Sequence, residues 1–254
     1  MDFLTRGDVR IAYDVHNPGG AGTPLLLSHG FSATGRMWDA NVDVLGADRP
    51  VVTWDQRGHG RSSAPHDASR YGEDACLGDM AALLDAVGAE RAVIGGMSLG
   101  GYLALAFHQL YPERCAALLL VDTGPGYKSD RGRAAWNEHC EKRAAAIEAE
   151  GFAGGASTET RAAAHDDPIG LAYAARYVMA QRDDHVIRSL PDVAVPTLVV
   201  VGADDTGFLA ATDYMESHIA GARKVVIPDA GHASNMDQPA AFNTAVRAFL
   251  DDLP

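Results

Sequence analysis

The chain of 254 residues contains no apolar run close to the roughly 18 residues that a membrane-spanning helix needs. Its first residues, Met1 to Arg6, also lack the basic stretch and apolar core that mark a secretory signal peptide. Because both features are missing, we expect a protein of the cytoplasm that has no membrane partner.

Basic residues are scarce as well. There are 21 Lys and Arg against 34 Asp and Glu, which gives a formal net charge of −13 at pH 7. Nucleic acids and anionic lipid surfaces attract positive charge, so we expect neither as a partner. The three cysteines, Cys76, Cys115 and Cys140, fit no disulfide or metal-ligand spacing. We therefore expect a reducing compartment and no bound metal.

What the chain does contain is a series of short apolar runs that alternate with helical patterns. Residues 2–15 have the pattern of a hairpin that turns at Gly7-Asp8. Buried strands are predicted at 25–27, 51–54, 92–95, 116–121, 197–201 and 224–227. Helices are predicted at 36–46, 72–87, 102–110, 208–219 and 237–252. This alternation predicts an α/β fold with a parallel sheet, whose functional loops share the rim at the carboxyl ends of the strands.

The alternation stops between residues 125 and 192. This segment is rich in alanine and charged residues, and Gly151, Gly154-Gly155 and Pro168 divide it into two or three helices. An insertion at the rim that carries the site predicts a lid over that site. The alternative is that these helices form an ordinary packing layer.

A serine lies at the centre of the sequence Gly96-Met97-Ser98-Leu99-Gly100, between a predicted strand and a predicted helix. A turn this tight drives its central residue towards positive φ, and the flanking glycines let the two backbones approach each other. The turn raises the serine hydroxyl above the sheet and points the first N–H groups of the helix at a ligand. Ser98 is therefore a candidate nucleophile. The turn lacks the Lys-Ser/Thr pair of a phosphate-binding loop, and we expect no cofactor.

A serine nucleophile requires a base and an acid. On an architecture of this kind, with the serine at a strand-to-helix turn of a parallel sheet, they follow it along the chain in the order acid, then histidine. Asp205 and His232 come in that order, each after a predicted strand. Asp204 is adjacent to Asp205, and Asp122 also ends a strand at the same rim, so both remain alternatives for the acid.

Two peptide N–H groups are needed to stabilise the oxyanion that forms during acyl transfer. We expect the N–H of Leu99 at the start of the helix and the N–H of Phe31 in the loop after residue 27. His29 is expected to anchor that loop. The polar sequence from Asp55 through Arg57 to His59 resembles a second catalytic cluster, but we expect a hydrogen-bonded loop that supports the rim.

Taken together, these motifs resemble the α/β-hydrolase superfamily. They are His29-Gly30-Phe31, Asp55-x-Arg57-Gly58-His59-Gly60-x-Ser62, Gly96-x-Ser98-x-Gly100, Gly202-x-x-Asp205 and Gly231-His232. The resemblance implies an eight-stranded, mostly parallel sheet flanked by helices, with a helical cap inserted after strand six. It divides the chain into a core of residues 1–124 and 193–254 and a cap of residues 125–192. It also implies that Ser98, Asp205 and His232 form a triad, with an oxyanion hole at Phe31 and Leu99. The proline that often follows the acid in this family is missing here.

Within that family, the motifs are most similar to the group of small esterases, enol-lactonases and cofactor-free haloperoxidase-like proteins. We therefore expect hydrolysis of a small, largely apolar ester or lactone through an acyl-enzyme on Ser98. A carbon–carbon bond hydrolase, or a lyase like the menaquinone-pathway synthase, would use the same triad. A non-enzymatic small-molecule receptor is a further alternative on this fold.

The sequence does not name the substrate, but it suggests an apolar pocket. The residues predicted to line it are Trp38, Met97, Tyr127, Trp136, Tyr173, Tyr177 and Met236. Basic side chains in the same pocket, such as Arg176 or Arg182, would favour a substrate with a carboxylate.

Overall fold

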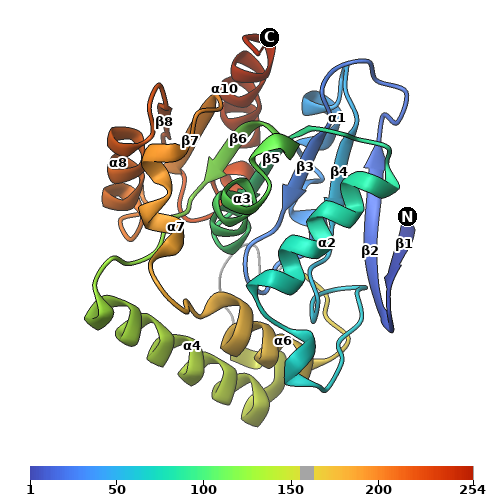
Figure 1. The fold of residues 1–254 in the computed structure, drawn as a ribbon, viewed down its shortest axis with the longest axis vertical. Helices are drawn as coiled ribbons and strands as arrows, with labels where there is room; N and C mark the ends of the chain where they lie inside the picture. Colours follow the sequence, from blue (N-terminus) through green and yellow to red (C-terminus); the bar gives the residue numbers. More distant parts are fainter. Residues whose placement is uncertain (155–162, 254) are drawn as a thin grey trace.

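The computed structural model describes residues 1–154 and 163–253. Its centre is one eight-stranded sheet with the strand order β1-β2-β4-β3-β5-β6-β7-β8 (Figure 1). The strands are β1 (Asp2–Arg6), β2 (Val9–His16), β3 (Leu25–Ser28), β4 (Val51–Trp54), β5 (Ala92–Met97), β6 (Cys115–Val121), β7 (Thr197–Gly202) and β8 (Arg223–Ile227). β2 pairs in the antiparallel sense with β1 and with β4, and all other neighbours are parallel. The predicted mostly parallel sheet and its leading hairpin are confirmed.

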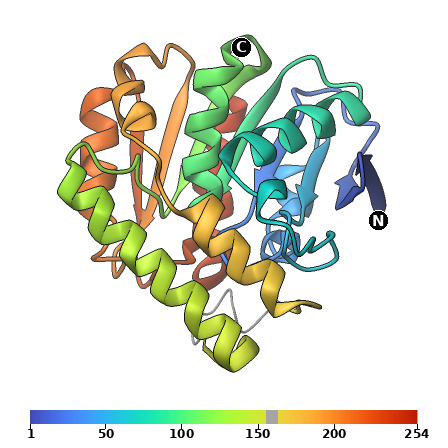
Figure 2. The ribbon, with the colours of Figure 1, turned by 60° about the horizontal axis from the view of Figure 1, so that its bottom comes forward.

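Helices cover both faces of this sheet (Figures 1 and 2). The longer ones in the described part are α2 (Glu73–Ala86), α3 (Leu99–Leu110), α4 (Asp130–Glu150), α8 (Leu209–His218) and α10 (Pro239–Asp251). Shorter ones are α1 (Val42–Leu45), α6 (Pro168–Ala174), α7 (His185–Arg188) and α9 (Ser234–Asp237). Single helical turns in the described part lie at Gly35–Trp38, Ala68–Arg70, Pro112–Arg114, Gly151–Gly154, Ala175–Met179 and Leu190–Asp192.

The side chains of the central strands alternate between two cores. Leu25 and Leu27 of β3 lie in the core under α1 and α10, whereas Leu26 between them lies in the core under α2, α3 and α8. Successive side chains on a strand point to opposite faces, so a strand covered on both faces is continuously apolar. This explains why the short apolar runs predicted these strands correctly.

The helix predicted over residues 36–46 is wrong. The chain there forms a single turn at Gly35–Trp38 and the short helix α1. Asn41 between them is fully buried, and its side-chain amide donates to the carbonyl of Asn235 and to Oδ1 of Asn243. These tertiary hydrogen bonds anchor the chain at a residue that is itself a poor helix former.

The segment between β6 and β7 is mainly helical. Ser129 caps the start of α4 by accepting a hydrogen bond from the N–H of Gly132, and the helix ends at Gly151, which has a φ of +68°. Asp167 caps α6, which begins at Pro168. The predicted breaks at Gly151 and Pro168 therefore coincide with helix ends. Gly155 lies outside the described residues. α4 and α6 lie across one end of the sheet (Figures 1 and 2).

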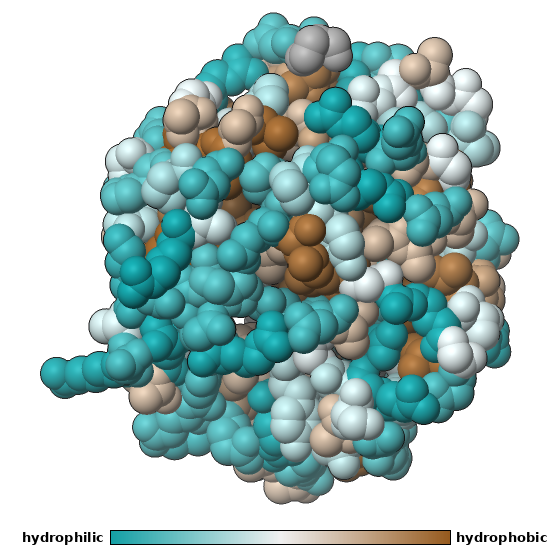
Figure 3. All heavy atoms as spheres, viewed as in Figure 1, coloured by the Kyte–Doolittle hydropathy of each residue, from teal (hydrophilic) through white to brown (hydrophobic). Residues whose placement is uncertain are grey.

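The face of the molecule in Figure 3 is mainly hydrophilic, with hydrophobic residues in small separate patches. Among the described residues, no helix is long and apolar enough to cross a membrane. All three cysteines are buried, and burial raises the pKa of the thiol of Cys76 and raises those of Cys115 and Cys140 to about 12. These thiols fill space in the core.

Candidate active site

Ser98 lies in the turn between β5 and α3, with φ +53° and ψ −114°. A positive φ costs a non-glycine residue about 1–3 kcal/mol, and such strain gathers at functional sites. A Cβ on Gly96 would lie 2.3 Å from the carbonyl carbon of Gly100, and a Cβ on Gly100 would lie 2.3 Å from the carbonyl oxygen of Ser28. Both positions therefore require glycine, as the sequence motif indicates.

The hydroxyl of Ser98 is hydrogen-bonded to His232, which is hydrogen-bonded in turn to Asp205. Oγ of Ser98 lies 3.0 Å from Nε2 of His232, and Nδ1 of His232 lies 2.8 Å from Oδ2 of Asp205. With the proton on Nδ1 held by the carboxylate, Nε2 is free to accept the serine proton. The ring of Phe208 stacks on the imidazole at a centroid distance of 4.7 Å. The three residues therefore have the geometry of a serine nucleophile with its base and acid.

The two alternative acids lie elsewhere. Asp122 is fully buried and accepts hydrogen bonds from the N–H of Gly202 and from both the N–H and the hydroxyl of Ser234. Burial raises the pKa of Asp122 to about 6 despite these donors. The carboxylate thus joins the ends of β6 and β7 to the start of α9, just after His232. Asp204 is exposed, and its backbone N–H donates to the carbonyl of Ala230.

Of the two residues predicted to donate to an oxyanion, Leu99 directly follows Ser98, and Phe31 follows Gly30, whose backbone lies close to Ser98. Leu99 is the first residue of α3, so its N–H has no acceptor within the helix. Phe31 follows β3 in a turn closed by a hydrogen bond of 3.1 Å from the N–H of Ala33 to the carbonyl of Gly30. Among the described residues, no hydrogen-bond acceptor contacts the N–H of Phe31. Both N–H groups therefore remain available for a ligand.

The polar loop after β4 is hydrogen-bonded within the scaffold. Asp55 accepts from the N–H of Gly35 and from Nε of Arg61, and Arg57 pairs with the buried carboxylate of Asp79 at 2.5 and 2.9 Å. None of these contacts involves Ser98 or His232. The arrangement matches the expected support of the rim rather than a second catalytic cluster.

Three histidines in and beside this loop have lowered pKa values, which favour the neutral imidazole. His29 and His59 are buried, His165 is half-buried, and their rings follow one another at centroid distances of 4.9 and 5.7 Å. Burial is the main cause that lowers the pKa of His29 to about 4 and lowers the pKa values of His59 and His165.

These histidines predict a loss of stability in mild acid. Below pH 6.5 the unfolded chain protonates all three rings, whereas the folded protein resists their protonation until the pH reaches the lowered pKa values. The free energy of unfolding therefore decreases as the pH is lowered. Asp122 opposes this loss of stability between pH 6 and 4. In that range its carboxyl is protonated in the folded protein but still ionised in the unfolded chain. Burial lowers the pKa of His108 in α3 as well, so four histidines against one carboxyl leave at most three protons, or about 4 kcal/mol per pH unit. Urea unfolding at pH 7 and at pH 5 measures this change in the free energy of unfolding.

The matched variants for this measurement are His165→Gln and, as a control, His218→Gln on the exposed face of α8. The first is expected to reduce the pH slope by up to one proton, and the second is expected to leave it unchanged. A stability that does not change between pH 7 and pH 5 would contradict the prediction.

A cavity of about 480 Å³ opens beside Ser98. Its walls are mainly apolar and aromatic, and none of the described residues that line it carries a formal charge. They are Ser98, Leu99, Tyr102, Thr123, Gly124, Pro125, Gly126, Tyr127, Trp136, Met179, Gln181, Gly207, Phe208, Ala210 and Ala211. Tyr127 and Trp136 are thus the two residues of the predicted pocket that line this cavity.

The other five predicted pocket residues do not line it. Trp38 and Met97 are fully buried in the core under α1 and α10, where Trp38 packs against the ring of Phe242. Met236 packs against the same core. These large apolar side chains lie next to the motifs in sequence, but the backbone directs them into the core instead of towards the rim.

The remaining two belong to an aromatic cluster near α6. Tyr173 contacts the rings of Tyr71 and Tyr177 at 5.5 and 5.7 Å, and Tyr177 is 40% exposed. Local sequence also missed Tyr102, Met179, Gln181 and Phe208 as lining residues, although Phe208 follows Asp205 by only three positions.

The basic residues that would favour a carboxylated substrate are engaged elsewhere. Arg176 forms ion pairs with Glu141 and Glu148 of α4. Arg182 pairs with Glu73 and Asp74 at the start of α2. Neither arginine lines the cavity.

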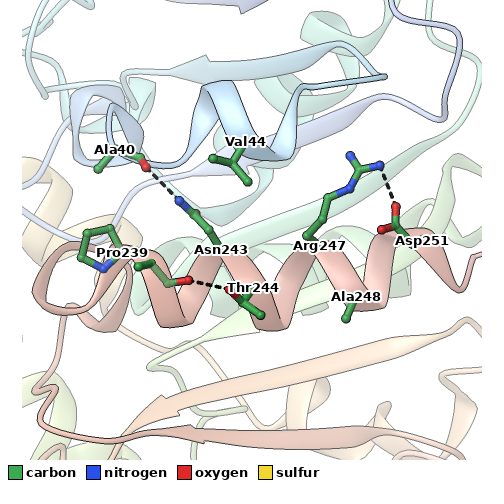
Figure 4. A pocket seen from close by; sticks show the side chains of 9 residues that line it. Ala40, Val44, Pro239, Asn243, Thr244, Arg247, Ala248 and Asp251 are labelled. Carbon is green, nitrogen blue, oxygen red and sulfur yellow. Dashed lines mark hydrogen bonds and ion pairs between the residues drawn. The ribbon is translucent and has the colours of Figure 1, made fainter.

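A second hollow, of about 710 Å³, lies between α1 and α10 (Figure 4). It is formed by small and polar side chains, among them Ala40, Asn243 and Arg247, and contains no residue of the predicted site. Asn243 donates to the carbonyl of Ala40, and Arg247 pairs with Asp251. The candidate active site is therefore the cavity at Ser98.

The chain belongs to the alpha/beta hydrolase family, whose model matches residues 25–245. This match confirms the resemblance inferred from the motifs, together with the fold and the hydrolase type of enzyme that it implied.

Three similar proteins cover almost the whole chain. A putative 2-succinyl-6-hydroxy-2,4-cyclohexadiene-1-carboxylate synthase of Bacillus subtilis is 26% identical over 100% of this chain and 99% of its own length. 3-Oxoadipate enol-lactonase 2 of Acinetobacter baylyi is 30% identical over 98% of this chain and 96% of its own. The solved structure of a thermophilic esterase from Thermogutta terrifontis, with malate bound, has a TM-score of 0.86 and 31% identity, with 98% and 96% of the two chains covered.

Proposed function

We propose that this hydrolase is a serine esterase that cleaves small, uncharged esters or lactones with an apolar group. The observation that carries the proposal is the hydrogen-bonded series Ser98–His232–Asp205 at the wall of a cavity whose described lining is uncharged. An ester carbonyl suits such a nucleophile, and burial of a charged substrate group without a partner would be costly. The similarity to an esterase and an enol-lactonase supports the same reaction class.

In the first half of the reaction, His232 takes the proton of Ser98 at Nε2 while Oγ forms a bond to the carbonyl carbon. The carbonyl oxygen becomes an oxyanion, which the N–H groups of Phe31 and Leu99 stabilise. The intermediate collapses by breaking the bond to the leaving oxygen, which takes the proton from Nε2 of His232. With an ester the product alcohol departs, whereas with a lactone the new hydroxyl stays attached to the acyl chain; in both cases the acyl group remains on Ser98.

In the second half, His232 takes a proton from water as the water oxygen attacks the acyl carbon. The second tetrahedral intermediate breaks its bond to Oγ, and His232 returns the proton to Ser98. The carboxylic acid is released and the enzyme is restored. Asp205 stabilises the imidazolium in both halves and holds its Nδ1 proton in place.

Residues 125–192 act in this scheme as a cap over the cavity. Tyr127 and Trp136 come from the start of this segment, and Met179 and Gln181 come from its later part. Gln181 accepts the N–H of Tyr127, and the indole N–H of Trp136 donates to the carbonyl of Met179. These bonds tie the two parts of the segment together where it meets the cavity.

A fluorophosphonate probe tests the acyl-enzyme directly. We expect the probe to label Ser98 covalently, and a p-nitrophenyl ester to release a burst of nitrophenol in stoichiometric amount with the enzyme. Peptide mass spectrometry locates the adduct, and Ser217→Ala on the exposed part of α8 serves as the control. A probe that fails to label Ser98 in the folded enzyme would refute the nucleophile.

Charge discrimination tests the substrate class. p-Nitrophenyl butyrate is expected to have a kcat/KM about 100-fold higher than a p-nitrophenyl monoester of glutaric acid, because the free carboxylate finds no cationic partner in the cavity. The comparison is made at pH 7.5 over a range of ionic strengths. Preference for the glutarate ester would instead favour a carboxylated substrate, and with it the lyase suggested by the Bacillus subtilis relative.

A further inference from the structure

The loop that carries the Phe31 N–H has an unfavourable backbone conformation. The turn Gly30–Ala33 is closed by the hydrogen bond from Ala33 to Gly30, and its third residue, Ser32, has a φ of +58°. Type II turns have this positive φ at the third position and strongly prefer glycine there. With serine in its place, the turn costs about 1 kcal/mol or more. Contacts from outside the turn must therefore stabilise it.

Three imidazoles supply those contacts, one for each successive peptide of the turn. Nδ1 of His29 lies 2.7 Å from the carbonyl oxygen of Gly30, in the same peptide as the Phe31 N–H. Nε2 of His59 accepts the N–H of Ser32 at 3.2 Å. Nε2 of His165 lies 3.0 Å from the carbonyl oxygen of Ser32.

The partners of the rings fix their tautomers. Nε2 of His29 accepts the N–H of Gln56 at 2.9 Å, so its proton is on Nδ1 and is donated to Gly30. Nδ1 of His165 accepts the N–H of Gly60 at 3.0 Å, so its proton is on Nε2 and is donated to Ser32. Each neutral ring thus donates at one nitrogen and accepts at the other.

His165 differs from the other two in its origin. His29 and His59 belong to the loops after β3 and β4, whereas His165 lies in the segment between β6 and β7, just before α6. Its ring is hydrogen-bonded both to Gly60 in the loop after β4 and to Ser32 in the loop after β3. Arg143 of α4, in the same segment, packs its guanidinium 5.0 Å from the centre of the Phe31 ring. The inserted segment therefore contacts the turn at two independent places.

We propose that His165 is a positioning residue for the oxyanion hole: by holding the Ser32 carbonyl, it keeps the Phe31 N–H directed at the reacting carbonyl group. Full stabilisation of the transition state then requires the inserted segment to be docked on the core. The proposal rests on the proposed function, because it assigns the Phe31 N–H to an oxyanion. His165 itself contacts no substrate.

Two substitutions separate the two hydrogen bonds of this ring. The amide of His165→Gln reaches the position of Nε2 and can donate to Ser32, whereas that of His165→Asn reaches only the position of Nδ1 and can accept from Gly60. We expect His165→Asn and His165→Ala to lower kcat for p-nitrophenyl butyrate by about 10- to 100-fold with KM within about twofold. His165→Gln is expected to restore kcat to within about threefold of the wild type. His218→Asn is the matched control on the protein surface.

Equal losses of kcat in the Gln and Asn variants, or a rise in KM instead of a fall in kcat, would overturn the proposal. So would an unchanged kcat in His165→Ala. Thermal unfolding of each variant shows whether a loss of kcat merely follows a loss of global stability. In that case kcat would correlate with Tm across the variants, and not with the presence of a donor to the carbonyl of Ser32.

Amide hydrogen exchange gives a readout that needs no substrate. The amides of Ser32 and Ala33, which donate to His59 and to the carbonyl of Gly30, are expected to exchange at least about 10-fold faster in His165→Asn than in His165→Gln, because only the Asn variant leaves the Ser32 carbonyl without a donor from residue 165. Equal exchange in the two variants would overturn the positioning role whatever the esterase result. If wild-type turnover does not depend on Ser98, the proposed function fails by itself, and the exchange experiment still decides whether His165 holds the turn.

Discussion

Replacing Ser98 with alanine is expected to lower kcat on short p-nitrophenyl esters by about 10⁴- to 10⁶-fold, because the variant lacks the hydroxyl that forms the proposed acyl-enzyme. His232→Ala is expected to have an effect of similar size, since the serine proton then has no acceptor. The double variant should be little worse than either single one, because the two side chains act as one unit. Stopped-flow and steady-state assays at pH 7.5 measure these losses.

Two controls make the result specific. Ser217→Ala and His218→Ala remove the same functional groups from the exposed part of α8 and should leave kcat within about twofold. The positive φ of +53° at Ser98 strains the backbone, and alanine, which also has a Cβ, bears the same strain. The substitution should therefore change Tm little. Substantial activity in Ser98→Ala, with the wild-type Tm retained, would mean that the hydrolytic nucleophile lies elsewhere.

The second large effect concerns the acid. Asp205→Asn is expected to lower kcat by about 10⁴-fold with little change in Tm, because the amide keeps the shape of the carboxylate but no longer holds the correct tautomer of His232 or stabilises its charge. Asp204→Asn should leave kcat within about twofold, since Asp204 is exposed and it is Asp205 that is hydrogen-bonded to Nδ1 of His232.

Asp122→Asn should give the opposite pattern. The carboxylate accepts three hydrogen bonds from Gly202 and Ser234, and an amide nitrogen facing one of these donors leaves it unsatisfied. A loss of about 1–3 kcal/mol in the free energy of unfolding follows. Activity should fall far less than in Asp205→Asn. A large loss of kcat confined to Asp122→Asn would instead identify Asp122 as the acid.

The sequence predicted the sheet well because each central strand is covered on both faces. Such strands are continuously apolar, and the glycines at Gly96 and Gly100 mark a turn where two backbones touch. The helix over residues 36–46 was overpredicted, because the hydrogen bonds of Asn41 to Asn235 and Asn243 come from a distant part of the chain. Local propensity contains no information on such partners.

The candidate site divides in the same way. Ser98, Asp205 and His232 were predictable because each follows a strand and their order is constrained. The cavity was not, since the same kind of side chain fills a core at Trp38 and lines a cavity at Trp136. Only the three-dimensional path of the chain distinguishes the two. For His165 no local signal exists, because its partners are 105 and 133 residues away in sequence.

The burial of all three cysteines has a practical consequence for experiments on this enzyme. Thiol reagents react with the thiolate, and Cys76, Cys115 and Cys140 are both inaccessible and resistant to ionisation in the folded protein. A cysteine placed on the surface of α4 or α8 would thus be the single reactive thiol of the native state. Reaction of the three natural thiols would in turn time the opening of the core, because a reagent reaches them only when the surrounding helices separate.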